Sequence, residues 1–182
     1  DSTGIATAER SGVFHMTKAR GQVREAFRTR DMRSLLGEIG LGHVRYATKG
    51  TASSEEEAQP FYVNAPYGIV LVHNGNLTNS AELRDLVDGR VGDEAYRGGE
   101  LARGNTTDTA LVTALLADDA DRTLEAAALD VLPRLRGAFC FVFIDEHTLY
   151  AARDPHGIRP LVIGRLERGW VFASETAALD IV

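Results

Sequence analysis

The chain has 182 residues, 44% of them hydrophobic and 25% charged, which is typical of one well-buried globular domain or a tight pair of subdomains. Its formal net charge of −6 argues against broad electrostatic binding to nucleic acid or to an anionic membrane. No run of about 18 apolar residues could span a membrane, and the first residues lack the basic and apolar regions of a signal peptide. These exclusions favour a soluble cytoplasmic protein.

The first part of the chain is expected to form strands around one short helix. Two apolar runs, residues 4–8 and 12–16, flank a polar triplet and predict a hairpin. The spacing of apolar residues within 32–39 predicts a short helix. Residues 41–46 and 67–73 predict two further strands, and the continuous apolar run in the second of these suits a strand that is buried on both faces.

Helices are expected in the middle of the chain. Residues 80–87 predict a helix with a serine as its N-cap, and the Ala- and Leu-rich segments 108–116 and 123–132 predict two more. Pro133 should end the last of them. Between these helices, the charged and Gly-rich stretch 88–104 predicts an irregular surface excursion.

The last third of the chain contains strand patterns separated by polar turns. The predicted strands are residues 138–144, 148–153, 161–164 and 170–173. Strands on both sides of a helical middle indicate an α+β domain built from layers.

Three polar clusters interrupt this apolar framework, each beside a predicted strand or at a helix start. Such positions are where a rigid scaffold usually presents its binding groups. The clusters are Gly42-His43-Val44-Arg45-Tyr46-Ala47-Thr48, His73-Asn74-Gly75-Asn76, and Asn105-Thr106-Thr107-Asp108-Thr109.

The chemical types in the clusters suit a free amino acid as ligand. Arg45 could pair with an α-carboxylate through two hydrogen bonds, and Asp108 could receive an α-ammonium group. Asn74 and the backbone N–H of Gly75 could hold the oxyanion that develops when an amide carbonyl is attacked. An amino acid with a side-chain amide would use all four groups.

Taken singly, each of these residues has a simpler explanation. An isolated arginine such as Arg45 is usually a surface salt-bridge partner, and Asn74 followed by Gly75 is commonly a turn. Thr107 or Asp108 at a helix start is commonly a cap. The combination of the residues is therefore what favours a site.

The remaining polar residues indicate structural roles. Arg153, Asp154 and Arg159 predict a charged loop with a local ion-pair network, and docking of a further domain is the alternative. Cys140 is the single cysteine, which excludes an internal disulfide; it lies in an apolar run and is expected to be a buried, inert thiol. Without metal-like spacing, the five histidines are interpreted as structural or exposed: His15, His43, His73, His147 and His156.

The three clusters resemble motifs of the class II glutamine amidotransferases, whose glutaminase domain uses an N-terminal cysteine. In the third cluster, Thr107 stands where that family has serine and Ala110 stands where an acidic residue is common, but Asp108 is kept. Within the family, residues 57–61, 73–79, 153–161 and 173–180 resemble the amidophosphoribosyltransferase branch. The branch that forms glucosamine 6-phosphate is less similar, because it has Trp at the position of Tyr46.

The resemblance implies a four-layer αββα sandwich, the N-terminal-nucleophile hydrolase fold. It also implies that glutamine is hydrolysed to glutamate and that the ammonia passes to phosphoribosyl pyrophosphate on a phosphoribosyltransferase domain of the same polypeptide. The product, phosphoribosylamine, begins purine synthesis, and a homo-oligomer is expected. By the same resemblance, Arg45, Thr48 and Asp108 bind substrate, and Asn74 and Gly75 form the oxyanion hole.

The nucleophilic cysteine of that family has no counterpart here, since the match begins at Asp1, after the family's first strand and helix. We therefore expect residues 1–182 to be a truncated glutaminase domain, without its phosphoribosyltransferase domain and inactive alone. The alternatives are a glutamine-binding regulatory module without a nucleophile, another class II amidotransferase, or a hydrolase that uses Ser2 or Thr3. No cofactor is expected in this chain, and the resemblance leaves open whether the parent uses Mg²⁺ or an iron–sulfur cluster.

Overall fold

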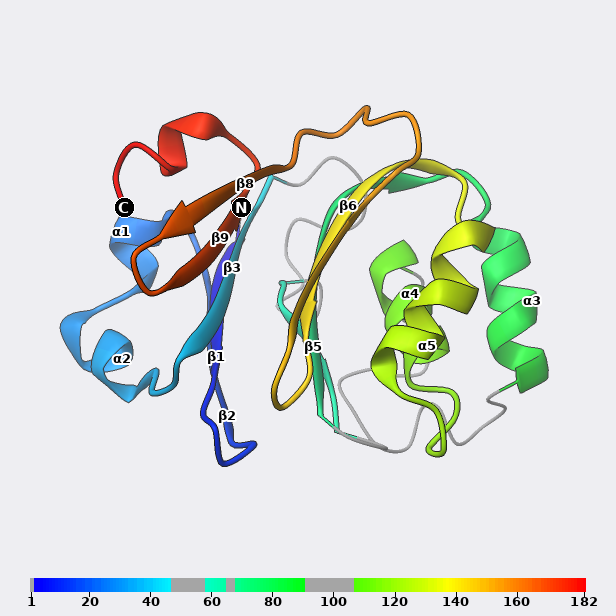
Figure 1. The fold of residues 1–182 in the computed structure, drawn as a ribbon, viewed down its shortest axis with the longest axis horizontal. Coiled ribbons are helices and arrows are strands. Elements are labelled where there is room, and N and C mark those ends of the chain that lie inside the picture. The colour runs from blue at the N-terminus through cyan, green and yellow to red at the C-terminus, as the bar shows by residue number, and fades with distance from the viewer. Residues whose placement is uncertain (1, 47–57, 65–67, 91–106) are drawn as a thin grey trace.

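The structure is a computed structural model that describes residues 2–46, 58–64, 68–90 and 107–182. Its secondary structure forms four layers, with two short helices, two layers of strands and three longer helices in succession (Figure 1). The strands are β1 (Ser2–Ala8), β2 (Phe14–Arg20), β3 (Ile39–Arg45), β4 (Phe61–Val63), β5 (Ile69–Leu77), β6 (Gly137–Ile144), β7 (Leu149–Arg153), β8 (Val162–Leu166) and β9 (Gly169–Ala173). The helices are α1 (Val23–Ala26), α2 (Thr29–Ser34), α3 (Ser80–Arg90), α4 (Asp108–Leu116) and α5 (Leu124–Val131).

The first layer of strands is built around β1. An antiparallel sheet has the order β2-β1-β3, and Ile5 of β1 pairs with Thr17 on one side and with Gly42 on the other. Strands β8 and β9 form a separate antiparallel hairpin on the same side of the molecule (Figure 1). The predicted hairpin near the start of the chain is confirmed, and each of its strands is longer than predicted.

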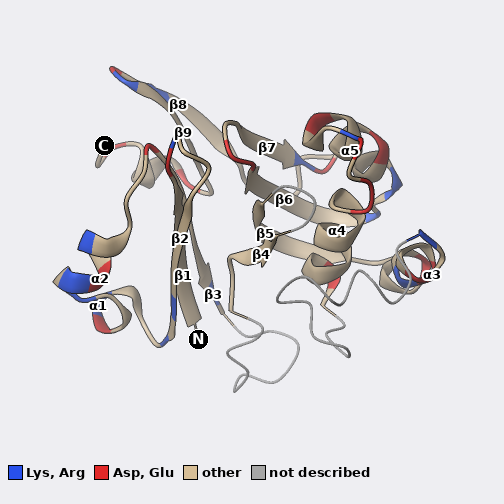
Figure 2. Cartoon of the chain, turned by 90° about the horizontal axis from the view of Figure 1, so that it is seen from below, with Lys and Arg blue, Asp and Glu red and all other residues tan. Residues whose placement is uncertain are grey.

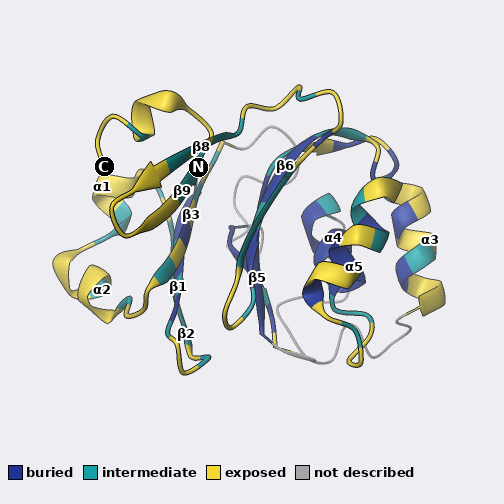
Figure 3. Cartoon of the chain, in the orientation of Figure 1, coloured by how far each residue is buried: buried dark blue, intermediate teal, exposed yellow. Residues whose placement is uncertain are grey.

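The second sheet has the order β4-β5-β6-β7, and its two central strands are buried on both faces. Leu71 of β5 and Phe141 of β6 pack against the helical layer, while Val70 and Ile144 pack against the first sheet. Most residues of β5 and β6 are therefore buried (Figure 3). This agrees with the continuous apolar run in the sequence, because a strand between two cores needs apolar residues on both faces.

Helix α4 lies inside the helical layer, where eight of its nine residues are buried. Its N-cap is Thr107, whose hydroxyl accepts a hydrogen bond from the Ala110 N–H at 3.2 Å. Thr123 caps α5 in the same way through the Ala126 N–H. Pro133 falls in a 3₁₀ turn (Leu132–Arg134) that follows α5, so the two strongest helix predictions are confirmed together with their ends.

Charged residues gather on the outer surface of the helical layer (Figure 2). Asp130 on α5 forms ion pairs with Arg90 at 3.1 Å, Arg122 at 3.2 Å and Arg134 at 2.7 Å. Hydrogen bonds from these arginines hold the pKa of the Asp130 carboxyl well below its usual range, and Arg134 makes the largest contribution. Since Arg90 is the last residue of α3, the ion pairs connect the C-terminal ends of α3 and α5.

The predicted helix over residues 32–39 is misplaced. Helix α2 covers only residues 32–34 of that segment, and the chain leaves helical geometry after Ser34. Met32 and Leu36, which the pattern placed on a buried face, are about half exposed, at 49% and 55%. Gly37 has a φ of +136°, and a Cβ there would lie 2.4 Å from the Ala8 carbonyl oxygen. The segment therefore turns against β1 instead of continuing as a helix.

Two other boundaries differ from prediction. Strand β5 does not end at His73 but continues through the polar cluster to Leu77. Helix α3 extends beyond 87 to Arg90, and Ser80 is its first residue, with a hydroxyl that donates to the Leu77 carbonyl instead of capping. The remainder of the predicted excursion, residues 91–104, lies outside the described residues. Among the helices that are described, none is long and apolar enough to cross a membrane.

Candidate functional site

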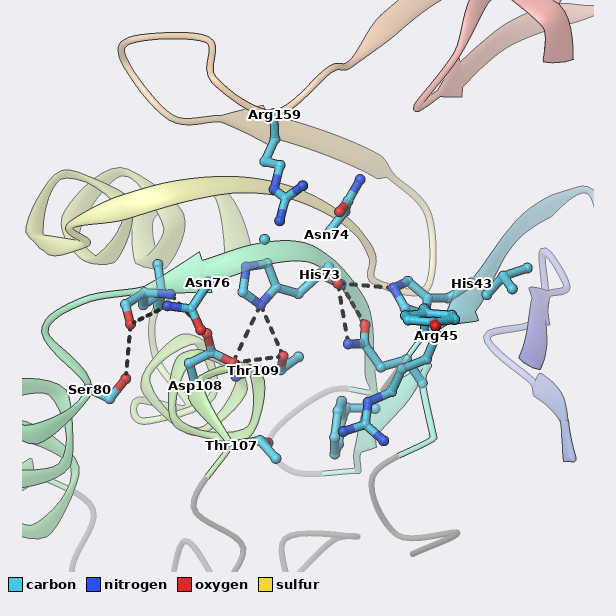
Figure 4. Close-up of a pocket in the computed structure, with 16 residues that line it drawn as sticks. His43, Arg45, His73, Asn74, Asn76, Ser80, Thr107, Asp108, Thr109 and Arg159 are labelled. Carbon is cyan, nitrogen blue, oxygen red and sulfur yellow. Dashed lines mark hydrogen bonds and ion pairs between the residues drawn. The ribbon is translucent and has the colours of Figure 1, made fainter. Parts of the chain in front are cut away.

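A pocket of about 500 Å³ opens where the ends of β3 and β5 meet the start of α4 (Figure 4). Its volume lies within the range of small-molecule sites. Side chains and backbone of 16 residues line it: His43, Val44, Arg45, Tyr46, Gln59, Phe61, His73, Asn74, Gly75, Asn76, Leu77, Ser80, Thr107, Asp108, Thr109 and Arg159.

The structure brings Arg45, Asn74, Gly75 and Asp108 to this one pocket. Arg45 is the last residue of β3, so it comes from the first sheet, whereas Asn74 and Gly75 belong to the second sheet and Asp108 begins α4. Three layers thus contribute to one cavity. Thr48, the fifth predicted site residue, lies outside the described residues.

Asn74 and Gly75 are part of strand β5. They therefore lie neither in a loop after the strand nor in a turn. Asn74 pairs with Cys140 and Gly75 pairs with Phe139 across the β5–β6 ladder. Gly75 has a φ of +149°, and a Cβ there would lie 2.1 Å from the Ala138 carbonyl oxygen. Only glycine fits this conformation and close approach, because other residues rarely adopt a positive φ and would clash with β6.

Asp108 is fixed at the N-terminus of α4 as an anion. One carboxylate oxygen accepts from the Leu77 N–H at 2.9 Å, and the other accepts from the Thr109 N–H at 2.9 Å. Burial raises the pKa of the Asp108 carboxyl, but His73 and these two backbone N–H groups outweigh burial, and the net pKa is below its usual value. The N-terminal end of the helix dipole also favours a negative charge here.

His73 joins β5 to α4 beneath the pocket. Its side chain is only 2% exposed and stacks on Phe141, with ring centroids 4.4 Å apart. Nδ1 lies 3.1 Å from the Thr109 hydroxyl and 3.6 Å from the Asp108 carboxylate. No described residue bonds its Nε2 atom. The structural role expected for His73 is consistent with these contacts, but its place beside Asp108 was not predicted.

His43 connects the first sheet to the same strand. Its Nε2–H donates to the His73 carbonyl oxygen at 3.0 Å, and that oxygen also accepts from the Gln59 amide at 3.3 Å. Burial lowers the pKa of His43 to about 4, so the ring is neutral at physiological pH. Its Nδ1 is buried without a hydrogen-bond partner in the described part of the chain. The hydrogen bonds to the His73 backbone hold β3, β5 and Gln59 in place around the pocket.

Arg159 reaches the pocket from the loop that follows β7 (Figure 4). The sequence predicted a local ion-pair network for this loop, and that prediction is wrong within the described residues. Asp154, which is 3% exposed, accepts instead from backbone N–H groups, including His156 at 3.0 Å and Ile158 at 3.1 Å. Neither Arg153 nor Arg159 pairs with a described carboxylate.

A family model described as "Glutamine amidotransferase domain" matches residues 43–180, which include every residue that lines the pocket. The chain belongs to this family. The pocket is therefore a feature of a glutamine amidotransferase domain, in which Arg45, Asn74, Gly75 and Asp108 all fall inside the matched range.

Named relatives of this glutamine amidotransferase domain agree with that assignment. "Amidophosphoribosyltransferase" of Mycobacterium tuberculosis (strain ATCC 25618 / H37Rv) is 48% identical over 185 residues, which cover 100% of this chain and 34% of the relative. The "Amidophosphoribosyltransferase" of Escherichia coli (strain K12) is 43% identical over 195 residues, covering 99% of this chain and 37% of the relative. The chain thus spans about a third of the length of these proteins.

A solved structure shares the fold. Glutamine phosphoribosylpyrophosphate amidotransferase from B. subtilis, in complex with ADP and GMP, superimposes with a TM-score of 0.81 at 28% identity, covering 99% of this chain and 37% of that one. The predicted fold, a four-layer αββα sandwich of the N-terminal-nucleophile hydrolase type, is confirmed by this likeness and by the layers in Figure 1.

Cys140 lies outside the pocket and is buried, as expected. It is 4% exposed, and its thiol contacts the carbonyl oxygens of Arg159 and Pro160 at 3.4 and 3.5 Å. Burial raises the pKa of the Cys140 thiol. Both its position and its protonation argue against a role as the attacking group. Within the described ranges, no three His, Cys, Asp or Glu side chains gather into a set that could hold a metal ion.

Proposed function

We propose that this chain is the glutamine-binding part of the glutaminase domain of an amidophosphoribosyltransferase. The observation that carries the proposal is the convergence of Arg45 and Asp108, which have opposite charges, on a pocket that also contains Asn74 and Gly75. A zwitterionic amino acid presents one negative and one positive group at its α-carbon. Arg45, Asp108 and the neutral polar groups of the pocket complement glutamine on all of these features.

In this proposal each residue contacts a different part of glutamine. Arg45 binds the α-carboxylate and Asp108 binds the α-ammonium group, which is favoured because the Asp108 carboxyl is held ionised. Asn74 and the Gly75 N–H bind the side-chain carbonyl oxygen. Thr48 is proposed as a supporting residue.

We extend the proposal to the parent protein on the basis of the names of the relatives. Ammonia released from glutamine would pass to phosphoribosyl pyrophosphate on a phosphoribosyltransferase domain and begin purine synthesis. The parent would be a homo-oligomer. The chain itself is proposed to need no cofactor for binding glutamine.

The chain alone is proposed to bind glutamine without hydrolysing it. The only cysteine in the printed sequence is Cys140; its thiol contacts the carbonyl oxygens of Arg159 and Pro160, and Cys140 does not line the pocket. A coupled assay for ammonia should therefore give no signal above the blank when pure chain is mixed with glutamine. Ammonia release that increases in proportion to the protein concentration would refute this part.

Calorimetric titration of the chain with L-glutamine tests the binding proposal. Arg45→Gln should weaken binding by about tenfold or more, because the charged hydrogen bonds to the α-carboxylate are lost. Arg168→Gln is the matched control, since Arg168 is exposed in the turn between β8 and β9 and does not line the pocket. The proposal fails if the unaltered chain does not bind glutamine, or if the two variants weaken binding equally.

A further inference from the structure

We propose that Arg159 is a specificity-determining residue that recognises negative charge at the side-chain end of the bound amino acid. The inference rests on the proposed function, because it takes glutamine as the reference ligand. It adds that the same pocket accepts glutamate, in which a carboxylate replaces the side-chain amide, and that Arg159 provides most of this affinity.

The backbone around Arg159 is fixed, although its side chain is exposed. Asp154 accepts from the Ile158 N–H at 3.1 Å and from the Arg159 N–H at 3.4 Å, and its own N–H donates to the Phe139 carbonyl at 2.8 Å. Gly157 adopts a φ of +64° within this turn. These hydrogen bonds of Asp154 therefore hold the loop against β6. They also fix the backbone position from which the Arg159 side chain extends.

The loop lies next to Asn74. The Arg159 carbonyl is within 3.4 Å of the Cys140 thiol, and Cys140 is the residue that pairs with Asn74 across the sheet. In Figure 4 the guanidinium of Arg159 points into the pocket beside the Asn74 side chain, while Asp108 and Thr107 lie on the other side of His73. Arg159 thus faces the end of the pocket where the amide of glutamine is proposed to lie.

Arg159 is the charged side chain of the pocket that the α-carboxylate and α-ammonium groups of a bound amino acid do not match. Of the charged side chains that line the pocket, Arg45 and Asp108 are matched by the α-carboxylate and the α-ammonium group of any amino acid. Arg159 makes no ion pair with a carboxylate of the described residues. A ligand with a second carboxylate would complete the charge balance, and a bidentate guanidinium–carboxylate contact is the geometry that arginine favours.

This arrangement has a consequence for the reaction of the parent protein. Hydrolysis of the glutamine amide consumes one water molecule and yields glutamate and ammonia, so the neutral end of the ligand becomes an anion. Arg159 would then hold glutamate more tightly than it held glutamine. The rate at which glutamate leaves the pocket would therefore depend on the Arg159 side chain.

The test compares two ligands with three forms of the protein. Dissociation constants for L-glutamate and L-glutamine are measured by calorimetry with the unaltered chain, with Arg159→Gln and with Arg168→Gln as the control. Arg159→Gln should weaken glutamate binding by about tenfold or more and glutamine binding by less than about threefold. Arg159→Lys, which keeps the charge, should recover part of the glutamate affinity.

The ratio of the two constants separates a specific role from a structural one. Equal losses for both ligands, or no change for either, would overturn the assignment of Arg159. An unaltered chain that binds glutamine but not glutamate would also overturn it, and would leave the proposed function standing. If neither ligand binds the unaltered chain, both proposals fail together.

Discussion

Replacing His43 with glutamine should make the folding of this chain much less sensitive to mild acid. His43 is largely buried with a neutral ring, and its Nε2–H donates to the His73 carbonyl at 3.0 Å. The amide of glutamine can donate in the same direction but does not titrate. The substitution therefore removes the proton equilibrium while keeping the contact between β3 and β5.

The size of the effect follows from the two pKa values of His43. Burial lowers its pKa from 6.5 to about 4 in the folded chain, whereas the unfolded chain keeps the higher value. Between these values the unfolded state binds the proton and the folded state does not, so stability is full above about pH 6.5 and is lost as the pH falls towards 4. Proton linkage gives a loss of about 2 kcal/mol between pH 7.5 and pH 5.

Urea unfolding at pH 7.5, 6 and 5 measures this loss directly. The unaltered chain should lose about 2 kcal/mol of unfolding free energy over this range, and His43→Gln should lose less than about 0.5 kcal/mol. His147→Gln is the control, because the His147 side chain is 71% exposed and the variant should behave like the unaltered chain. A His43→Gln variant that keeps the full acid sensitivity would show that His43 is not the buried neutral group responsible.

Two further predictions concern stability and have matched controls within the chain. Gly75→Ala should destabilise the fold by at least about 2 kcal/mol, because the added Cβ meets the Ala138 carbonyl at a positive φ, whereas Gly89→Ala in α3 meets nothing within 4 Å and should add about 0.5–1 kcal/mol. Similar urea midpoints for these two variants would contradict the backbone argument. Leu115→Ala should cost about 2–5 kcal/mol because Leu115 is fully buried in the helical core, and Leu129→Ala, at a residue 71% exposed, should cost less than about 0.5 kcal/mol. Comparable losses for the two leucines in thermal or urea unfolding would count against the core described above.

The elements that could be predicted from the sequence are those determined by local signals. Helices α4 and α5 carry their own caps, Thr107 and Thr123, and Pro133 ends the second one, so no distant contact was needed to locate them. The segment 35–38 could not be predicted in the same way. Its apolar residues follow a helical spacing, but Gly37 packs on the Ala8 backbone, and that contact is not visible in a local pattern.

The site shows the same division between local and distant information. Arg45, Asn74, Gly75 and Asp108 were predicted because each belongs to a short polar cluster whose residue types fit one ligand, and the structure places all four at one pocket. His43 and His73 were assigned only structural or exposed roles, since their partners are 30 and 36 residues away in the chain. Arg159 was misjudged because its neighbours in sequence are charged. The fact that Asp154 bonds backbone N–H groups instead of arginines becomes clear only from the folded loop.

The register of β5 explains why polar residues can occupy the end of a strand that is buried on both faces. Side chains alternate across a strand, so His73 faces α4 with Leu71, whereas Asn74 faces the first sheet with Val72. A slip of one residue would place Asn74 under α4 and His73 between the sheets, and His73 would lose its contacts with Thr109 and Asp108. The same slip would remove Gly75 from its close approach to Ala138, where no other residue fits. The apolar cores on both faces and the Gly75 contact therefore select one register, and that register positions Asn74 and Gly75 in the pocket.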